Sequence, residues 1–514
     1  MGLQKLVMGN RKLTNLMMSR MPASAHVGRG EKRALEVARA AIERTAAYPE
    51  HLLIAGAPAG VPKTMDAFHR LPVIDKHSYV DQYSLPDLAL DGRFSCAYTI
   101  ERSSGHSGGS FYWLRLPEED ALFPQYLEHA FSQFYGMGER STLVLITLAL
   151  GTWTSGEKMA QALRQVAAKG RYELTVMAPG TDVDEILEIV GDLGSHYDQV
   201  VMVGYPPFLK TVIDEGIRTG IDWKSMNVKL GLGGEGYSEQ WRAHVGAQLG
   251  IDVSKDLLAI SGGYGAADVG MSIGREYPLT VLLRQLCVED LALAQALFGD
   301  KAARSGTLPG LVQYNPATSY IEEIEGELVF TVMSGIPLVR YNIHDSGGVL
   351  PFDQTLEALK DHGYDIAARL EALGYGSEQL WKLPFFYVFG RSDGTVSIVG
   401  ANVFPENIQA ILSESGDEAI VTFRLSVSTS EEFSQRLVID MEHHSEDLLE
   451  SEAALLSEHY RLLLLSGLRR INQDFRDAHD DNPQCADPVV TIHCRRTGPF
   501  SARSGIKNLY IAKP

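Results

Sequence analysis

The sequence predicts an α/β protein with a large N-terminal domain and a small α+β domain at the C-terminal end. Three observations support this prediction. Apolar segments of strand length alternate with helical segments between residues 141 and 268, a pattern typical of parallel sheets covered by helices. The sequence becomes strand-rich from about residue 311. Its length of 514 residues also exceeds what one hydrophobic core usually serves.

The elements of the N-terminal domain follow in a regular order. Apolar residues at helical spacing predict a helix over 31–48. The alternating region predicts strands over 141–150, 172–180, 198–207 and 228–236, helices over 158–170, 183–194, 208–220 and 238–250, and a further apolar segment over 256–268. Strand-rich segments then cover 310–316, 320–333 and 336–343. We expect a ligand site at the carboxyl ends of the parallel strands, where loops of such sheets bind ligands.

A domain boundary is predicted near residues 389–408, which gives domains of 1–389 and 390–514. Beyond the boundary, strand and helix patterns alternate through the segments 408–415, 419–428, 435–443, 451–475 and 488–494. Their combined length is that of a typical small domain.

Composition narrows the classes of function. Hydrophobic residues make up 45% and charged residues 22% of the chain, as in globular proteins. The formal net charge of −19 argues against a nucleic-acid partner, because nucleic-acid binders usually carry a basic face. No apolar run has the length needed to span a bilayer. The sequence therefore predicts neither a nucleic-acid nor a membrane partner.

The cysteines and the N-terminal segment indicate a cytoplasmic protein. The four cysteines form no C-x-x-C pair, so neither a zinc knuckle nor a redox motif is predicted. Reduced thiols are the expectation for a cytoplasmic chain. The basic N-terminus has no continuous apolar stretch and no small-residue cleavage site, which are features of a secretory signal.

The stretch "RSSGHSGGS" at 102–110 has two interpretations. Ser and Gly make a flexible spacer, and they also let backbone N–H groups converge on an anion. The stretch lies between the segment "SCAYTI" and the apolar "FYWLRL", inside a folded region, which favours the anion loop. It is not a Walker loop, because no Gly-Lys-Ser/Thr sequence closes it.

Five further motifs follow in order: "GLGGEGYS" (231–238), "GGYGAADVG" (262–270), "IPLVRYNIHDSG" (336–347), "GRSDGTVSIVGANVFPENI" (390–408) and "ARSGIKNLYI" (502–511). Each is weak alone. In this order and spacing the set resembles the adenylate-forming superfamily, and within it the phenylacetate–CoA ligase branch. The resemblance covers nearly the whole chain. It implies a large adenylation domain that binds ATP and the acid, and a small mobile lid domain that carries a catalytic lysine.

The resemblance also implies how ATP is held. The residues that would surround the β- and γ-phosphates all lie in the Ser/Gly stretch: Ser103, Ser104, Gly105, His106, Ser107 and Gly108. His106 stands where the family often has a cationic loop residue, and an exposed loop imidazole is its plain alternative. The residues that would line the adenine pocket or bind the ribose follow predicted strands: Gly233, Gly234, Glu235, Tyr264, Gly265 and Asp345.

The remaining roles fall on the other motifs. Asp268 would bind Mg²⁺ and Lys507 would bridge the substrate carboxylate and the α-phosphate during catalysis. Arg391 would contact the nucleotide at the hinge between the domains, which Asp393 marks. A weaker interpretation places Tyr205 and Phe208 in the wall of the acid pocket, although buried aromatic residues more often belong to a core.

The sequence departs from the family pattern at three places. Ala267 replaces the usual Ser or Thr, Asp268 replaces a Glu, and Ile343–His344 replaces the Thr-Gly before Asp345. Plain structural interpretations compete with the assigned roles. Asp268 would then cap a helix N-terminus, and Glu235 would lie in the first turn of a helix.

The predicted function is ATP-dependent activation of a carboxylic acid as an acyl-adenylate, followed by transfer to CoA. An amide ligase that transfers the acyl group to an amino acid is an alternative, as is transfer to a carrier-protein thiol. Ala267 and the lysine-free loop motivate a third alternative, a non-catalytic nucleotide-binding relative. The branch suggests an aromatic or cyclic acid, and relatives suggest a homodimer.

Overall fold

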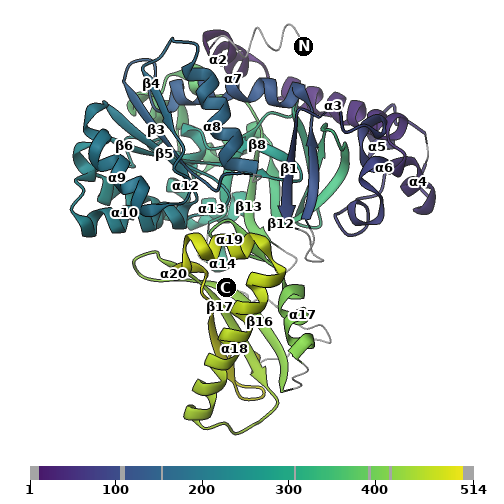
Figure 1. Ribbon diagram of the computed structural model, residues 1–514. Helices are drawn as coiled ribbons and strands as arrows, with labels where there is room; N and C mark the ends of the chain where they lie inside the picture. The colour runs from purple at the N-terminus through teal and green to yellow at the C-terminus, as the bar shows by residue number, and fades with distance from the viewer. Residues whose placement is uncertain are drawn as a thin grey trace. The chain divides into compact units, whose positions relative to one another are not determined.

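The computed structural model describes residues 11–501, except 59, 96, 105–109, 152–153, 306–307, 392–394 and 416–418. The chain divides into two compact units. The larger unit contains Met1–Ser103, Tyr112–Gly204 and Gly216–Gly390, and the smaller unit contains Ser104–Phe111, Tyr205–Glu215 and Arg391–Pro514. Figure 1 shows the chain coloured from its N-terminus to its C-terminus.

The first half of the central sheet is parallel, as the alternating sequence predicted. Its strands are β3 (Thr142–Thr147), β4 (Leu174–Met177), β5 (Gln199–Gly204) and β6 (Val228–Leu232), and β7 (Ile260–Ala266) continues it. Every residue of β3, β5 and β6 is buried, which explains their largely apolar sequences. The connections contain α8 (Thr154–Ala167), α9 (Val183–Leu193), α10 (Pro206–Thr219) and α11 (Glu239–Leu249). The predicted strands and helices of this region are therefore confirmed.

The second half of the sheet is antiparallel. It contains β8 (Gly270–Arg275), β9 (Gly310–Tyr314), β10 (Ser319–Ile324), β11 (Glu327–Val332), β12 (Leu338–Leu350) and β13 (Phe385–Arg391). Among the described residues the two halves form one sheet of 11 strands, in the order β10-β11-β12-β13-β9-β8-β7-β6-β5-β3-β4. Strand β7 joins them, because it pairs parallel with β6 and antiparallel with β8.

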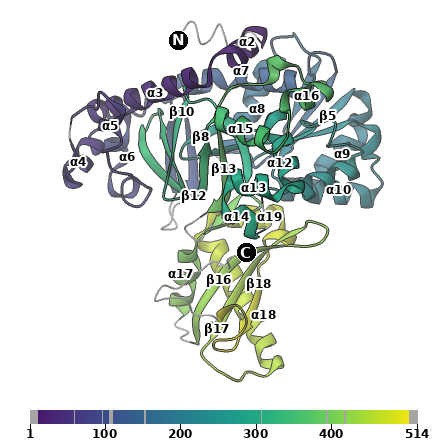
Figure 2. The same ribbon diagram turned by 180° about the vertical axis from the view of Figure 1, so that it is seen from behind.

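Helices cover both faces of this sheet (Figures 1 and 2). The N-terminal helices are α2 (Arg11–Arg20), α3 (Ala23–Arg44), α4 (Ala47–Ile54), α5 (Met65–Phe68) and α6 (Leu85–Leu88). The helix predicted over 31–48 thus begins earlier and ends at Arg44. Helix α3 contacts β10, β11 and β12. Later helices are α12 (Pro278–Glu289), α13 (Leu291–Phe298), α14 (Asp300–Ser305), α15 (Phe352–Asp361) and α16 (Ile366–Ala372).

A separate hairpin precedes the parallel half. Strands β1 (Thr99–Ser104) and β2 (Ser110–Arg115) form a two-stranded sheet, and α7 (Pro117–Phe134) follows directly. The Ser/Gly stretch therefore connects two paired strands, as expected for a loop inside a folded region. Its residues 105–109 lie outside the described part of the chain.

The C-terminal part of the chain has a small α+β fold. Strands β16 (Ile420–Thr429) and β17 (Gln435–His443) pair antiparallel, and β18 (Val489–His493) pairs parallel with β17. The remaining elements are β14 (Val396–Ile398), β15 (Ala401–Val403), α17 (Pro405–Ser415), α18 (Glu450–Ile471), α19 (Gln473–Asp481) and α20 (Pro483–Ala486). A large α/β part and a small α+β part therefore confirm the predicted fold class. Within residues 11–501 as described, no helix is both long and apolar enough to cross a membrane.

Candidate functional site

Strand β7 brings two predicted site residues together. Its sequence ISGGYGA ends in the turn that leads to β8. The hydroxyl of Tyr264 on β7 donates a hydrogen bond to Asp345 Oδ2 on β12, with an O···O distance of 2.6 Å. Phe330 stacks nearly parallel to the Tyr264 ring at a centroid distance of 5.9 Å, and Phe386 meets the ring edge at 5.1 Å. These contacts fix the plane of the tyrosine ring.

Glycine is required where other atoms approach β7 closely. A Cβ on Gly265 would lie 3.0 Å from the carbonyl oxygen of Gly270, which is closer than most Cβ atoms come to a neighbouring atom. A Cβ on Gly262 would lie 2.9 Å from the Tyr237 hydroxyl. The glycines of the predicted motif 262–270 therefore leave room for other atoms to pack closely against β7 on either side of Tyr264.

The glycine turn predicted to line an adenine pocket lies beside β7. The Gly233 N–H donates to the carbonyl oxygen of Gly204 at the end of β5, at 3.3 Å. Gly234 has a φ of +81°, a left-handed conformation that favours glycine. A Cβ on Gly233 would lie 3.9 Å from the Gly263 carbonyl oxygen. The turn therefore follows the carboxyl ends of parallel strands, where the sequence predicted a site.

The expected position of Glu235 in a helical first turn is wrong. Helix α11 begins only at Glu239, with Ser238 as its N-cap. The Ser238 side chain accepts a hydrogen bond from the Trp241 N–H at 3.1 Å, so the N-cap stands three residues after Glu235. Glu235 lies in the preceding turn instead.

Asp268 occupies the turn between β7 and β8. The helix N-cap interpretation of this residue is wrong, because β8 rather than a helix follows the turn. Asp268 Oδ2 accepts a hydrogen bond of 2.5 Å from the hydroxyl of Tyr341 on β12. Among the described residues, no group of three or more His, Cys, Asp or Glu is placed to hold a metal ion. A single carboxylate still suits Mg²⁺, which usually takes one or two protein ligands together with waters and phosphates.

A buried charged cluster connects this turn to the β1–β2 hairpin. Arg115 is only 1% exposed, and its Nε donates to Glu101 Oε2 at 2.7 Å. Another guanidinium nitrogen donates to the Ala267 carbonyl oxygen. Lys158 on α8 donates to the second oxygen of Glu101 at 3.0 Å. Burial lowers the pKa of Arg115, but the carboxylates of Glu101 and Glu119 more than offset this effect, so that its pKa is raised overall.

A second buried cluster supports the other side of β7. Glu276 is 3% exposed and accepts hydrogen bonds from the Gly262 N–H at 2.8 Å and from the Tyr237 hydroxyl at 2.6 Å. Arg242 and Arg284 donate to its other oxygen at 2.7 and 3.1 Å. Burial raises the pKa of Glu276, but the two arginines dominate and lower it to about 2. Glu276 therefore stays ionised and anchors the backbone just before Tyr264.

Arg115 and Glu276 were not among the predicted site residues. Arg115 stands in the otherwise apolar segment "FYWLRL", and Glu276 follows β8 in "IGREYP". A charged residue inside or next to a buried strand is a signal that such a network exists. Its partners could not be inferred, since Arg115 and Ala267 lie 152 positions apart.

The other predicted site residues that the structure describes lie elsewhere in the fold. Ser103 and Ser104 end strand β1, and Arg391 ends strand β13. Phe208 is fully buried in α10, and the Tyr205 ring packs against Gly400 within the smaller unit. The remaining predicted site residues lie outside the described residues: Gly105, His106, Ser107, Gly108, Asp393 and Lys507.

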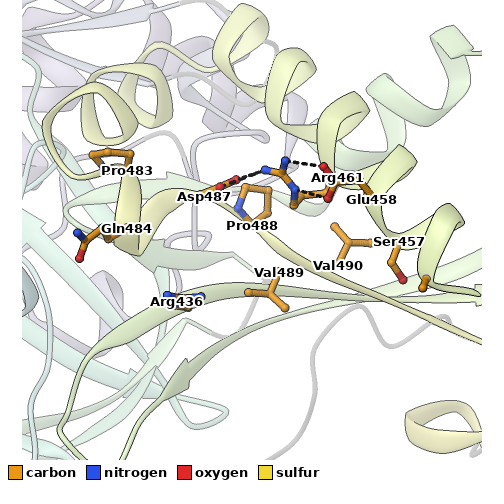
Figure 3. Close-up of a pocket in the computed structure, with 11 residues that line it drawn as sticks. Arg436, Ser457, Glu458, Arg461, Pro483, Gln484, Asp487, Pro488, Val489 and Val490 are labelled. Atoms are coloured by element: carbon orange, nitrogen blue, oxygen red, sulfur yellow. Dashed lines mark hydrogen bonds and ion pairs between the residues drawn. The ribbon is translucent and has the colours of Figure 1, made fainter.

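The smaller unit contains a hollow of about 410 Å³. Residues of α18, β17 and β18 and the segment 483–488 line it (Figure 3). Arg461 on one wall donates to Asp487 and to Glu458, as the dashed lines in Figure 3 show. None of the predicted site residues within the described chain lines this hollow.

Comparison with known proteins agrees with this architecture. No family model matches the chain. A phenylacetate–coenzyme A ligase from Aromatoleum evansii is 23% identical over 282 residues, which are 54% of this chain and 51% of the relative. The chain thus spans about half the length of this curated relative. Crystal structures of 2-hydroxyisobutyryl-CoA ligase share the fold. A complex with 2-HIB-AMP and CoA in the thioesterification state gives a TM-score of 0.63 at 15% identity, covering 96% of this chain and 91% of that one.

An open conformation of the same ligase gives a TM-score of 0.52 at 15% identity, covering 96% of this chain and 93% of that one. The large and small parts of this chain therefore share the fold of 2-hydroxyisobutyryl-CoA ligase. Over about half of its length the chain is also similar in sequence to the phenylacetate–coenzyme A ligase of A. evansii.

Proposed function

We propose that the protein activates a carboxylic acid with ATP and transfers the acyl group to the thiol of CoA. One observation carries this proposal: the Tyr264–Asp345 pair is placed beside the glycine turn 233–235, at the carboxyl ends of parallel strands. An aromatic ring, a carboxylate and exposed backbone groups are what recognition of adenine and ribose requires. The chain presents them within a fold that the superfamily uses for adenylation.

In this proposal, different residues would bind the ribose, the adenine, the Mg²⁺ ion and the phosphates of ATP. Asp345 can accept hydrogen bonds from the ribose hydroxyls, and its bond with Tyr264 holds the tyrosine ring in one orientation. Phe330 covers one face of that ring, and adenine would pack on the opposite face. Asp268 is the carboxylate that would hold Mg²⁺, which when bound neutralises phosphate charge. Ser103, Ser104 and the loop 105–108 would surround the phosphates with N–H and O–H donors.

Two displacements make up the reaction. A carboxylate oxygen of the acid attacks the α-phosphorus of ATP, the bond to the bridging oxygen breaks, and pyrophosphate leaves. The sulfur of CoA then attacks the acyl carbon, the bond to the AMP oxygen breaks, and the thiol proton passes to solvent. Lys507 would stabilise the charge that develops at the α-phosphate in the first step. Arg391 and Asp393 would form the hinge about which the small domain, residues 390–514, reorients between the steps.

The proposed acceptor of the acyl group is CoA. In the alternative, an amide ligase, the adenylation step is the same, and the amine of an amino acid attacks the acyl carbon in place of the CoA sulfur. An aromatic or cyclic acid is proposed as substrate, and a cytoplasmic homodimer as the working form.

Pyrophosphate release tests this function. The protein is incubated with ATP, Mg²⁺ and one acid from an aromatic, cyclic and aliphatic panel, alone, with CoA, or with amino acids. We expect release with an aromatic or cyclic acid that rises further with CoA. The Lys507→Ala variant should lose roughly 100-fold or more in rate while it still binds ATP. Lys513→Ala, near the same end of the chain, is the control and should keep its activity.

Each other result has a definite meaning. Release that rises only with amino acids would establish the amide ligase. Binding of ATP without release for any acid, in the wild-type protein, would favour a non-catalytic nucleotide-binding relative. Unchanged release by Lys507→Ala would exclude the lysine from the adenylation step.

A further inference from the structure

Arg115 is a buried charge of the larger unit whose partners lie on two separate segments of the chain. Its guanidinium contacts a carboxylate on β1 through Nε at 2.7 Å and the carbonyl oxygen of Ala267 in the β7–β8 turn. The third nitrogen, Nη1, is buried and has no hydrogen-bond partner among the described residues. It lies 3.8 Å from Glu119 Oε1. A Cβ on Gly270 at the far end of the turn would be 3.8 Å from the same nitrogen.

This geometry makes Arg115 a link between two segments of the larger unit. On one side stands Glu101 of strand β1. On the other side stands the turn that carries Asp268, the proposed magnesium ligand. Ala267 has no polar side chain with which to fix the turn, so its backbone carbonyl is held instead. A guanidinium suits this task because its donors point in fixed directions.

The partners of Arg115 keep the buried cation in place. Burying an isolated charge is very unfavourable, whereas a paired charge is tolerated. Glu101 supplies the facing negative charge at 2.7 Å, and Lys158 on α8 contacts its second oxygen. Burial raises the pKa of Glu119 to about 7, so this carboxyl, 3.8 Å from Nη1, is only partly ionised near neutral pH. A link to the turn that served packing alone could be made by apolar residues, which are often as stabilising as a buried ion pair. The charged cluster is therefore better explained by a role in fixing the position of the Asp268 carboxylate.

We infer that Arg115 is a positioning residue for the proposed adenylation step, fixing the Asp268 turn relative to the β1–β2 hairpin. This inference rests on the proposed function. Arg115 does not touch the reacting atoms. It acts by holding the turn in one place, and small displacements of a catalytic group are enough to lower a rate by about two orders of magnitude.

The test uses Arg115→Met, which keeps much of the side-chain volume, and Arg115→Lys, which keeps the charge. Arg340→Met is the matched control. Arg340 is another buried arginine of the larger unit, and it bonds to Glu322 and to the carbonyl oxygens of His69 and Leu71 instead of the turn. Three quantities are measured for each variant: the melting temperature, hydrogen exchange of peptides covering 262–275, and pyrophosphate release against Mg²⁺ concentration.

We expect Arg115→Met to exchange faster at residues 266–270 without any ligand, to lose about 10- to 100-fold in kcat, and to need roughly fivefold more Mg²⁺ for half-maximal rate. Arg115→Lys should recover part of the kcat. Arg340→Met should lower the melting temperature without changing the Mg²⁺ requirement. An Mg²⁺ requirement that changes equally in Arg115→Met and Arg340→Met would reduce Arg115 to a structural role and overturn the inference.

Unchanged exchange of the turn in both Arg115 variants would also overturn it, whatever their activity. If Arg115→Met does not fold, Arg115→Lys decides by the same criteria. Failure of the proposed function has a different signature. The wild-type protein would then release no pyrophosphate with any acid, and the inference would fall with the function.

Discussion

One hydrogen bond joins Tyr264 and Asp345, two residues of the proposed nucleotide site, from distant parts of the sequence. They stand 81 positions apart, on strands that are not neighbours in the sheet. Asp345 is 7% exposed, and a carboxylate so buried needs partners to remain ionised. The Tyr264 hydroxyl supplies one partner, and in the proposed complex the ribose hydroxyls would supply others.

Asp345→Ala should weaken ATP binding about 10- to 100-fold, because hydrogen bonds to a charged group contribute about 1.5–3 kcal/mol. Tyr264→Phe keeps the ring and removes the hydroxyl that bonds to Asp345, so ATP affinity should fall by about tenfold or less. Calorimetric titration with ATP in the absence of acid measures both. Asp353→Ala, an exposed carboxylate on α15, is the control. Equal affinity in the wild-type and Asp345→Ala proteins would disprove the ribose role.

At the scale of elements, β8 packs so closely near its C-terminal end that glycine is favoured at position 274. A Cβ on Gly274 would lie 2.5 Å from Val312 Cγ2 and 2.6 Å from Phe386 Cε1. Phe386 also touches the ring of Tyr264. The packing of β8 against β9 and β13 therefore sets the position of the site.

Gly274→Ala should destabilise the protein by about 1–3 kcal/mol, since overpacking forces neighbouring side chains to shift. Gly28→Ala is the matched control. Gly28 lies in α3, and a Cβ added to it would have no other atom within 4 Å, so alanine should stabilise the helix by about 0.5–1 kcal/mol. Urea denaturation measures both changes. An unchanged free energy of unfolding in Gly274→Ala would mean that β9 and β13 shift to accept the added methyl group. These strands would then not set the position of Tyr264.

The elements that the sequence predicted best are those with a local signal. Strands β3, β5 and β6 are buried along their whole length and read as apolar runs, while their glycine turns identify the strand ends. Glu235 and Asp268 were each given a helical alternative that is wrong, because the residues of a turn do not determine where the next helix or strand begins. The clusters around Arg115 and Glu276 had no local signal for their partners, which come from several elements far apart in the sequence.

At the scale of the whole molecule, the residues proposed to bind adenine and ribose belong to one unit. The turn after β6, strand β7 and the Asp345 segment of β12 are all in the larger unit. Strands β16, β17 and β18 form a separate sheet whose hydrogen bonds are made among themselves. The two units can therefore be expected to respond differently to a nucleotide.

AMP binding should slow hydrogen exchange most in peptides covering 228–238, 260–270 and 343–347, because ligand binding reduces the population of open states at the contacted segments. Peptides from β16 and β17 should change little, since their amides are already protected by their own sheet. Exchange measured with and without AMP checks this expectation, and Asp345→Ala at the same AMP concentration is the control that should lose the protection. Protection confined to the smaller unit would instead move the nucleotide site away from Tyr264 and Asp345, and the roles proposed for both residues would have to be abandoned.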